Sequence, residues 1–306
     1  MNDLPSYAKI NWLLRVLGRR PDGYHEIVTV FQSIDVADRL TFSTHADDGR
    51  ITLTYDGAAN IPLDETNLVV RAANALRQRY GVRRGAAIHL SKQIPASGGL
   101  GGGSSNAAVT LLGLARLWRV PARHAELCEI GAELGADVPF FLTGGTALGT
   151  GLGTDLAVLD DLPEQFLIVV TPGVGVATAT AYRDLHAPDL TNADTAHIFT
   201  VSREAHALAG SFPSALANDF ESVVLKQEPE IARVKDALQL SGARAAMLSG
   251  SGSSVFGIFA DAPTQARAVA WLTENKSHDW RIFPCRTLTR TAYRDNLGEC
   301  AEYSAR

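Results

Sequence analysis

The chain carries, between residues 94 and 108, the stretch Ile94-Pro95-Ala96-Ser97-Gly98-Gly99-Leu100-Gly101-Gly102-Gly103-Ser104-Ser105-Asn106-Ala107-Ala108. Its five glycines in six residues cost backbone entropy on folding, so they are expected only where side chains would obstruct a close approach. Apolar residues then recur at 108, 111, 112, 115 and 118, which is the spacing of one helix face. A bare glycine loop that opens a helix presents unpaired N–H groups and the positive end of the helix dipole. The stretch therefore predicts an anion site, and phosphate is the favoured anion.

Other interpretations of this loop fit less well. A Walker A loop would end in Gly-Lys-Ser/Thr, yet no lysine lies between Lys92 and the end of the helix. A strict G-x-G-x-x-G is absent because Ser104 stands at the last glycine position. A flexible Gly/Ser linker is the remaining alternative. An alternating strand pattern at 87–91 precedes the loop and an apolar helix follows it, which favours a phosphate loop within a domain.

The composition limits the class of protein. A length of 306 residues with 46% hydrophobic content is sufficient for two domains. The net charge of -5 argues against a nucleic-acid partner, and no apolar run reaches bilayer length, which argues against a membrane protein. Cys128, Cys285 and Cys300 have no zinc-site spacing and no export signal is visible, so we expect reduced thiols in a cytoplasmic protein.

Three segments outside the loop carry polar groups of interest. Alternation from Tyr7 to Trp12 places Lys9 and Asn11 on one face of a strand. Asp137 lies between a helix stop and a proline in the segment 134–139; taken alone, that position favours a helix N-cap. The Gly/Ser segment 249–253, taken alone, is typical of an ordinary turn before a strand.

The remaining pattern predicts an α+β chain whose domain boundary lies near 157–164, with domains at 1–158 and 159–306. In the first half we expect a strand at 7–18, a turn at 19–23, strands at 39–44, 50–55 and 86–92, helices from Thr66 to Tyr80, from the loop to Trp118 and from Pro121 to Leu134, and an irregular region at 139–156. In the second half we expect strands at 166–170, 244–248, 254–260 and 280–286 and helices at 194–209, 214–226, 229–240 and 262–274. Two strand-helix-strand units in this half predict a ferredoxin-like layer.

The order of these segments resembles the GHMP kinase superfamily of small-molecule kinases. The motifs that carry the resemblance lie at 95–106, 134–139 and 248–257, and the similarity covers essentially the whole chain. Ala8-Lys9-Ile10-Asn11, the segment 20–26 with Asp-Gly-Tyr-His, and Asn67-Leu68-Val69-Val70 are similar to the branch that acts on 4-diphosphocytidyl-2-C-methyl-D-erythritol. The resemblance implies an N-terminal domain like ribosomal protein S5 domain 2, a ferredoxin-like C-terminal domain, and ATP-dependent phosphorylation of the 2-hydroxyl of that substrate in non-mevalonate isoprenoid synthesis. Ala96-Ser97 and Ser251 depart from the usual motif residues, which affects loop details.

The resemblance also implies roles for individual residues. Asp137 would be the general base and Lys9 would keep it ionised while offsetting phosphoryl charge. ATP would bind the loop 95–105, backed by the late loop residues Gly250, Ser251 and Gly252, with Asn67 and Lys92 on the nucleoside side. Mg²⁺ would arrive with ATP, and Ser105 is its candidate protein ligand. The substrate would contact Asn11, Tyr24, His25, Thr178 and Tyr182, with Tyr24 and His25 at the cytosine.

Three rival functions follow from the same residues. One is another GHMP kinase, acting on mevalonate, homoserine or a sugar. A second is a nucleotide-binding regulatory module without catalysis, which the presence of both Lys9 and Asp137 disfavours. A third, a dinucleotide-dependent oxidoreductase, lacks its glycine fingerprint and the acidic residue after a second strand. Oligomeric state does not follow from the sequence.

Overall fold

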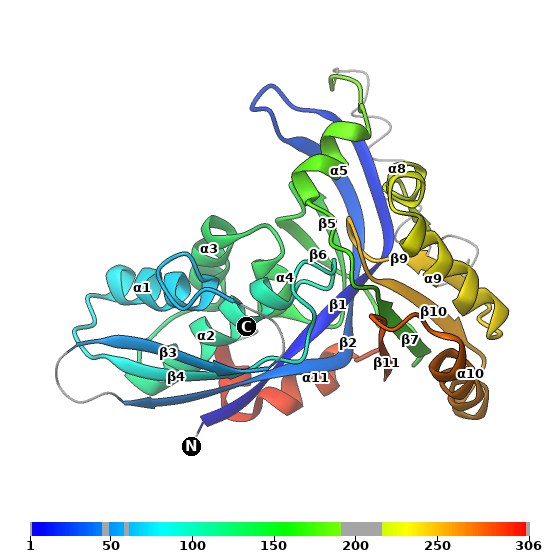
Figure 1. Cartoon of the computed structure of the whole chain (residues 1–306). Coiled ribbons are helices and arrows are strands. Elements are labelled where there is room, and N and C mark those ends of the chain that lie inside the picture. Colours follow the sequence, from blue (N-terminus) through cyan, green and yellow to red (C-terminus); the bar gives the residue numbers. More distant parts are fainter. Residues whose placement is uncertain (1, 45–48, 58–60, 191–215, 304–306) are drawn as a thin grey trace.

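The computed structural model describes residues 2–44, 49–57, 61–190 and 216–303 (Figure 1). Two long strands run through the whole molecule. Strand β1 (Asn2–Arg19) pairs antiparallel with β2 (His25–Thr44) along its entire length, from Asn2 opposite Phe42 to Arg19 opposite His25. Residues 20–24 form the predicted turn, with Gly23 at a φ of 87°. The expected strands at 7–18 and 39–44 are therefore confirmed as parts of one ribbon.

The first sheet is built on this ribbon. Strand β2 pairs with β4 (Ala86–Ser91) through its second half and with β5 (Thr146–Gly151) through its first half. Strand β3 (Ile51–Asp56) lies parallel to β4, β6 (Asp155–Val158) pairs with β5, and the short β8 (Ala217–Asn218) pairs with β1. The expected irregular region at 139–156 is wrong: its glycines occur within and beside a β5–β6 hairpin.

Helices cover one face of the first sheet. They are α1 (Leu68–Tyr80), α2 (Gly102–Trp118), α3 (His124–Leu134) and α4 (Val138–Thr143). Their apolar faces form one buried cluster with the sheet, which includes Leu112, Phe140 and Trp118. Two predicted starts were displaced. Asn67 rather than Thr66 caps α1, because its side chain accepts from the Val69 N–H, and α3 begins three residues after Pro121.

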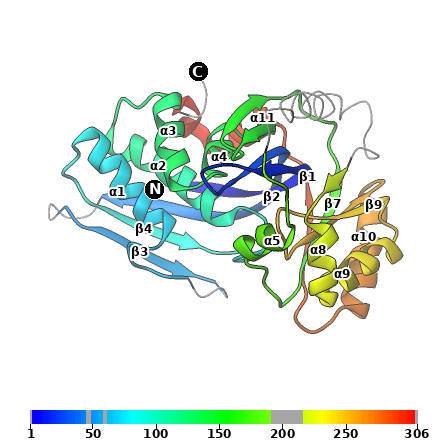
Figure 2. The same cartoon turned by 90° about the horizontal axis from the view of Figure 1, so that it is seen from above.

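The second sheet has the predicted ferredoxin-like order. Strands β7 (Phe166–Thr171), β9 (Ala245–Leu248), β10 (Val255–Phe259) and β11 (Arg281–Arg286) lie in the order β11-β7-β10-β9 with antiparallel neighbours. Helices α8 (Glu221–Gln227), α9 (Pro229–Leu240) and α10 (Ala262–Asn275) flank it on the outside (Figure 2). The expected helix at 214–226 is shorter, since 217–218 form β8, and the expected helix at 194–209 lies outside the described residues.

The two sheets pack face to face. Ala8, Ile10 and Trp12 of β1 are buried against Val169 and Phe256 of the second sheet. This confirms the predicted alternation, because the opposite face of β1 is left to Lys9 and Asn11. Figure 1 shows the resulting arrangement, with helices outside each sheet and the β1–β2 ribbon crossing between them.

Two C-terminal and linking helices complete the described chain. Helix α5 (Thr178–Asp184) lies beside the turn of the β1–β2 ribbon (Figure 1). Helix α11 (Arg290–Leu297) and a 3₁₀ turn (Gly298–Tyr303) return to the first half, where Tyr293 and Cys300 join its core. The domain division at 158/159 stays a prediction. Among the described residues, no helix combines the length and apolar character needed to cross a bilayer.

Candidate active site

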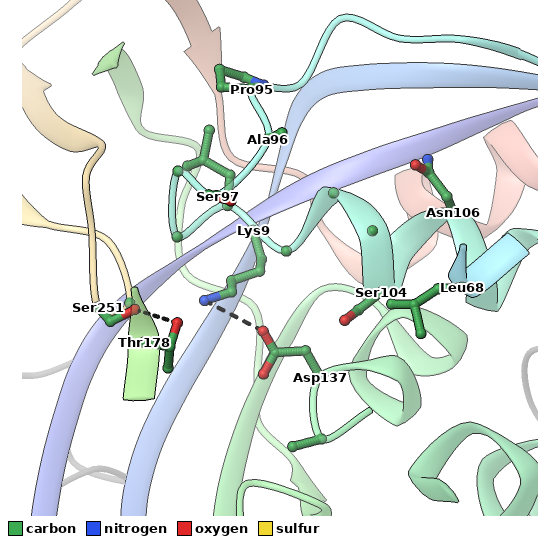
Figure 3. Close-up of a pocket in the computed structure, with 18 of the residues that line it drawn as sticks. Lys9, Leu68, Pro95, Ala96, Ser97, Ser104, Asn106, Asp137, Thr178 and Ser251 are labelled. Atoms are coloured by element: carbon green, nitrogen blue, oxygen red, sulfur yellow. Dashed lines mark hydrogen bonds and ion pairs between the residues drawn. The ribbon is translucent and has the colours of Figure 1, made fainter. Parts of the chain in front are cut away.

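A pocket of about 540 Å³ opens where the two halves meet. The glycine loop forms one wall, and β1, β2, the start of α4, α5 and the late loop 249–253 form the others. Pro95, Ala96, Ser97 and every residue from Gly98 to Ser104 line it, and ATP binding by these residues stays a prediction. Figure 3 shows this loop above Lys9 and Asp137, with Thr178 and Ser251 on the opposite side.

Lys9 and Asp137 meet on the floor of the pocket. The Lys9 ammonium lies 3.6 Å from the Asp137 carboxylate, although 128 positions separate them in the chain (137 − 9). The Asp137 side chain makes no capping hydrogen bond to α4. The carboxylate therefore points into the pocket (Figure 3), and the N-cap interpretation of this residue is wrong for its side chain.

The surroundings of Lys9 balance burial against charge. Its ammonium also donates to the Asn11 side-chain oxygen at 2.7 Å and lies 5.7 Å from the centre of the Phe31 ring. Burial lowers the pKa of the Lys9 amine from its ordinary value near 10.5, and the Asp137 carboxylate opposes that shift. A cation held this way can offset negative charge that develops beside it.

The glycine loop leaves the start of α2 open. Gly101 is the N-cap, and as a glycine it places no capping side chain over the first N–H groups of this 17-residue helix. Such an end attracts anions through its N–H groups and its dipole. Close packing also requires the glycines: a Cβ on Gly99 would lie 2.0 Å from the Ser249 carbonyl oxygen, and one on Gly101 would lie 2.6 Å from the Phe141 ring.

The late loop holds the glycine loop from the second half of the chain. The Ser249 hydroxyl donates to the Gly99 carbonyl, and the Ser254 N–H donates to the Gly98 carbonyl, both at 3.0 Å. The Ser251 hydroxyl lies 2.9 Å from that of Thr178. Gly250 and Ser251 line the pocket, whereas Gly252 belongs to the same turn but is not part of the lining.

Three of the predicted nucleotide residues have side chains that bond to other parts of the protein. Ser105 is completely buried, its hydroxyl accepts from Ser6, and it does not line the pocket, so its position does not fit a Mg²⁺ ligand. Asn67 lines the pocket, but its side-chain oxygen caps α1. Lys92 also lines it, yet its ammonium donates to the Asp38 carboxylate at 2.5 Å and to the Ile94 carbonyl at 2.8 Å.

A second cavity of about 1070 Å³ adjoins the first on the side of the ribbon turn. Thr178 and Tyr182 line both cavities, and Tyr24 and His25 line the second. The His25 ring stacks on Tyr182 with ring centres 4.8 Å apart, while Tyr24 is 64% exposed. Burial and the nearby Arg19 lower the pKa of His25 from 6.5, which favours the neutral imidazole at pH 7.

Sequence reasoning missed residues that support the site from behind. The buried Asp38 carboxylate accepts from the backbone N–H groups of Gln93 and Ile94 and from the Asn106 amide, so it binds the chain on both sides of the glycine loop. Asn218 donates to the Leu248 and Gly250 carbonyls and fixes the late loop. An aspartate within an apolar strand segment was the only sequence signal for Asp38.

Both halves of the sequence match models of known protein families. The family model described as GHMP kinases N terminal domain matches residues 67–145, and the one described as GHMP kinases C terminal matches residues 202–277. The 4-diphosphocytidyl-2-C-methyl-D-erythritol kinase of Moorella thermoacetica is 41% identical, over 94% of this chain and 98% of its own length. The enzyme of that name from Pelotomaculum thermopropionicum is 44% identical, over 86% and 90%.

Solved structures give the same comparison in three dimensions. A crystal structure of 4-(cytidine 5'-diphospho)-2C-methyl-D-erythritol kinase superposes with a TM-score of 0.75 at 33% identity, covering 93% of this chain and 98% of that one. A homoserine kinase from Cytophaga hutchinsonii superposes with a TM-score of 0.72 at 19% identity, over 94% and 95% of the two chains. The latter similarity concerns the fold alone.

Proposed function

The chain belongs to the GHMP kinase family, and we propose that it transfers the γ-phosphoryl group of ATP to the 2-hydroxyl of 4-diphosphocytidyl-2-C-methyl-D-erythritol. The observation that carries this proposal is the Lys9–Asp137 pair, which faces the uncapped start of α2 across one pocket. That arrangement places a base, a cation and a phosphate cradle around the same space. These are the groups that phosphoryl transfer to an alcohol requires.

ATP occupies the pocket beneath the glycine loop in this proposal. Its phosphates accept hydrogen bonds from the N–H groups at the start of α2, where the helix dipole also stabilises them. The wall that carries Asn67 and Leu68 receives the nucleoside end. Lys92 contributes through the loop it anchors, because its ammonium donates two of its three possible hydrogen bonds to Asp38 and to the Ile94 carbonyl.

Asp137 acts as the general base. As the oxygen of the 2-hydroxyl forms a bond to the γ-phosphorus, the bond from that phosphorus to the bridging oxygen of ADP breaks and the hydroxyl proton passes to the Asp137 carboxylate. Lys9, which lies 3.6 Å from the Asp137 carboxylate, offsets the negative charge of the transferring group. Since Asp137 is not engaged in capping α4, its oxygens are available to the substrate.

Mg²⁺ fits this pocket as an ion that arrives with ATP. Among the described residues, no three His, Cys, Asp or Glu side chains gather to hold a metal. The pocket offers the Ser104 hydroxyl beside the helix start, and Mg²⁺ is commonly held by few protein oxygens together with substrate phosphates. When bound, the ion would neutralise phosphate charge, and Ser104 is the residue that would hold it.

The cytidine end of the substrate lies in the second cavity in this proposal. Tyr182 and His25 offer a stacked pair of flat rings there, and the exposed ring of Tyr24 lies on the same wall. The neutral His25 imidazole can both donate and accept, which suits the polar edge of a cytosine. Thr178 lines both cavities, at the junction where the methylerythritol unit would pass.

We also propose the cytoplasm as the compartment. All three cysteines, Cys128, Cys285 and Cys300, are free thiols, and Cys285 and Cys300 are buried. Unpaired cysteines are typical of a reducing compartment.

The test is a coupled assay for ADP release, with the phosphorylated product identified by ³¹P NMR. We expect turnover with ATP and 4-diphosphocytidyl-2-C-methyl-D-erythritol and none above background with mevalonate, homoserine or galactose. Equal turnover with one of these alcohols would refute the proposed substrate. Absence of ADP release with every acceptor would remove the kinase assignment.

A further inference from the structure

A row of hydrogen bonds runs from Lys9 along the wall of the pocket, which Asn11 and Thr29 also line. The Lys9 ammonium donates to the Asn11 side-chain oxygen at 2.7 Å. The Asn11 amide donates to the Thr29 hydroxyl at 2.7 Å, and that hydroxyl donates to the Leu13 carbonyl at 2.8 Å. Thr29 is completely buried, and Asn11 and Lys9 are 1% and 4% exposed. These buried groups therefore satisfy one another rather than water.

The chemistry of the row fixes its direction. A threonine hydroxyl can donate one hydrogen bond, and here Thr29 donates it to the Leu13 carbonyl. The hydroxyl can then only accept from Asn11, so the amide nitrogen faces Thr29 and the amide oxygen faces Lys9. In the flipped orientation, an NH₂ group would face the ammonium, which is also only a donor. The backbone carbonyl of Leu13 thus selects the orientation through Thr29.

The β1–β2 register brings these residues together. Asn11 lies opposite Phe31 but Leu13 lies opposite Val30, so Trp12 is an extra residue in β1. Such a bulge bends a strand and redirects its side chains. Beyond it, Leu14 lies opposite Thr29.

We propose that Thr29 is a positioning residue that, through Asn11, holds the Lys9 ammonium against Asp137. This role rests on the proposed kinase function, because it concerns the cation of that site. Thr29 does not act on the reacting atoms. It supplies the acceptor for the Asn11 amide N–H, and this bond fixes the position from which the Asn11 oxygen accepts from Lys9.

Among the groups around the Lys9 ammonium, the Asn11 side-chain oxygen is the main uncharged hydrogen-bond acceptor. Asp137, from the start of α4, is the carboxylate that faces it, and Phe31 of β2 presents its ring. Tyr182 of α5 has a pKa raised to about 12, mainly by burial and then by Asp137, so it is neutral at ordinary pH. The late loop contributes the uncharged Gly250, whose added Cβ would lie 3.3 Å from the Lys9 ammonium.

The test compares Thr29→Val, which keeps the shape and removes the hydroxyl, with Thr29→Ser, which keeps the hydroxyl. For Thr29→Val we expect kcat to fall about tenfold, because a charge-assisted hydrogen bond loses its alignment. The KM for ATP should stay within about twofold, since the glycine loop is untouched. The alkaline limb of the pH–rate profile should move to lower pH by about one unit, because a less supported ammonium loses its proton earlier. Thr29→Ser should restore both values.

A second measurement separates this inference from the kinase assignment. NMR titration of the Lys9 side chain in the full-length protein, labelled at lysine, needs no turnover. A lower pKa for Lys9 in Thr29→Val, restored in Thr29→Ser, is expected. An unchanged Lys9 titration and an unchanged profile in Thr29→Val would overturn the role of Thr29 while leaving the kinase intact. A parent protein that releases no ADP with any acceptor would instead overturn the proposed function, and the inference with it.

Discussion

Replacement of Asp38 by asparagine should loosen the glycine loop from beneath. One Asp38 oxygen accepts from the backbone N–H groups of Gln93 and Ile94, both at 2.7 Å. The other accepts from the Lys92 ammonium at 2.5 Å and from the Asn106 amide at 2.9 Å. Asparagine has the same shape but one oxygen only. Its NH₂ group must therefore face either two N–H donors or the ammonium and the Asn106 amide.

The expected loss of stability is large. Asp38 is completely buried and the Lys92 side chain is 5% exposed, so removal of one partner leaves a buried charge uncompensated. Such a change costs about 3–5 kcal/mol, against a total stability of about 5–15 kcal/mol for a typical domain. Burial already lowers the pKa of Lys92, and loss of the opposing Asp38 charge lowers it further. Because Lys92 keeps its ordinary pKa in the unfolded chain, the destabilisation should shrink as pH rises from the lowered value toward 10.5.

Denaturant unfolding measures this loss, and calorimetric titration with ATP measures the affinity. The matched control is Asp3→Asn, which breaks the exposed Asp3–Arg39 pair next to Asp38 and should cost less than about 1 kcal/mol. In the double variant Asp38→Asn/Lys92→Met, the buried charge is gone, so part of the stability should return. If the free energy of unfolding of Asp38→Asn lay within about 1 kcal/mol of that of the parent and the variant bound ATP normally, the role of Asp38 in holding both sides of the glycine loop would be refuted.

Three further predictions concern the pocket itself. Asp137→Asn should retain ATP binding and fold but lose about two orders of magnitude in kcat; near-parent turnover in the coupled assay would exclude it as the base. As the pH rises, activity should begin to decline before pH 10.5, the ordinary pKa of lysine, because burial lowers the pKa of Lys9 and the proposed reaction needs its charge. A profile flat up to pH 10.5 would contradict this. Gly101→Ala should lower the melting temperature, because Gly101 has a φ of 70° and an added Cβ would lie 2.6 Å from the Phe141 ring. Gly103→Ala, whose Cβ would lie 3.6 Å from Leu68, should keep the melting temperature of the parent and only weaken ATP binding. Equal melting temperatures for the two variants would show that packing does not require a glycine at position 101.

Much of the site follows from patterns local in the chain. Alternation from Tyr7 to Trp12 correctly separated the apolar face of β1 from the polar face of Lys9 and Asn11. The glycine run correctly predicted the start of a helix without a capping side chain, and the anion site there stays a prediction. The errors occurred where the same local signal serves two structures. Glycines in the segment 139–156 suggested an irregular region, but they lie within and beside the β5–β6 hairpin, whose strand β5 also pairs with β2.

The sequence by itself determined which residue types lie on each face and where the glycine loop opens a helix, because helix and strand periods are properties of neighbouring residues. Tertiary structure alone decided which groups meet. Asp38 reaches Lys92 and Asn106 across 54 and 68 positions, and Thr29 reaches Asn11 only in the register that the extra residue Trp12 sets. A hydrogen bond depends on distances of a few tenths of an ångström. Such distances are fixed by how two sheets and a helix pack, and no local pattern of residues records them.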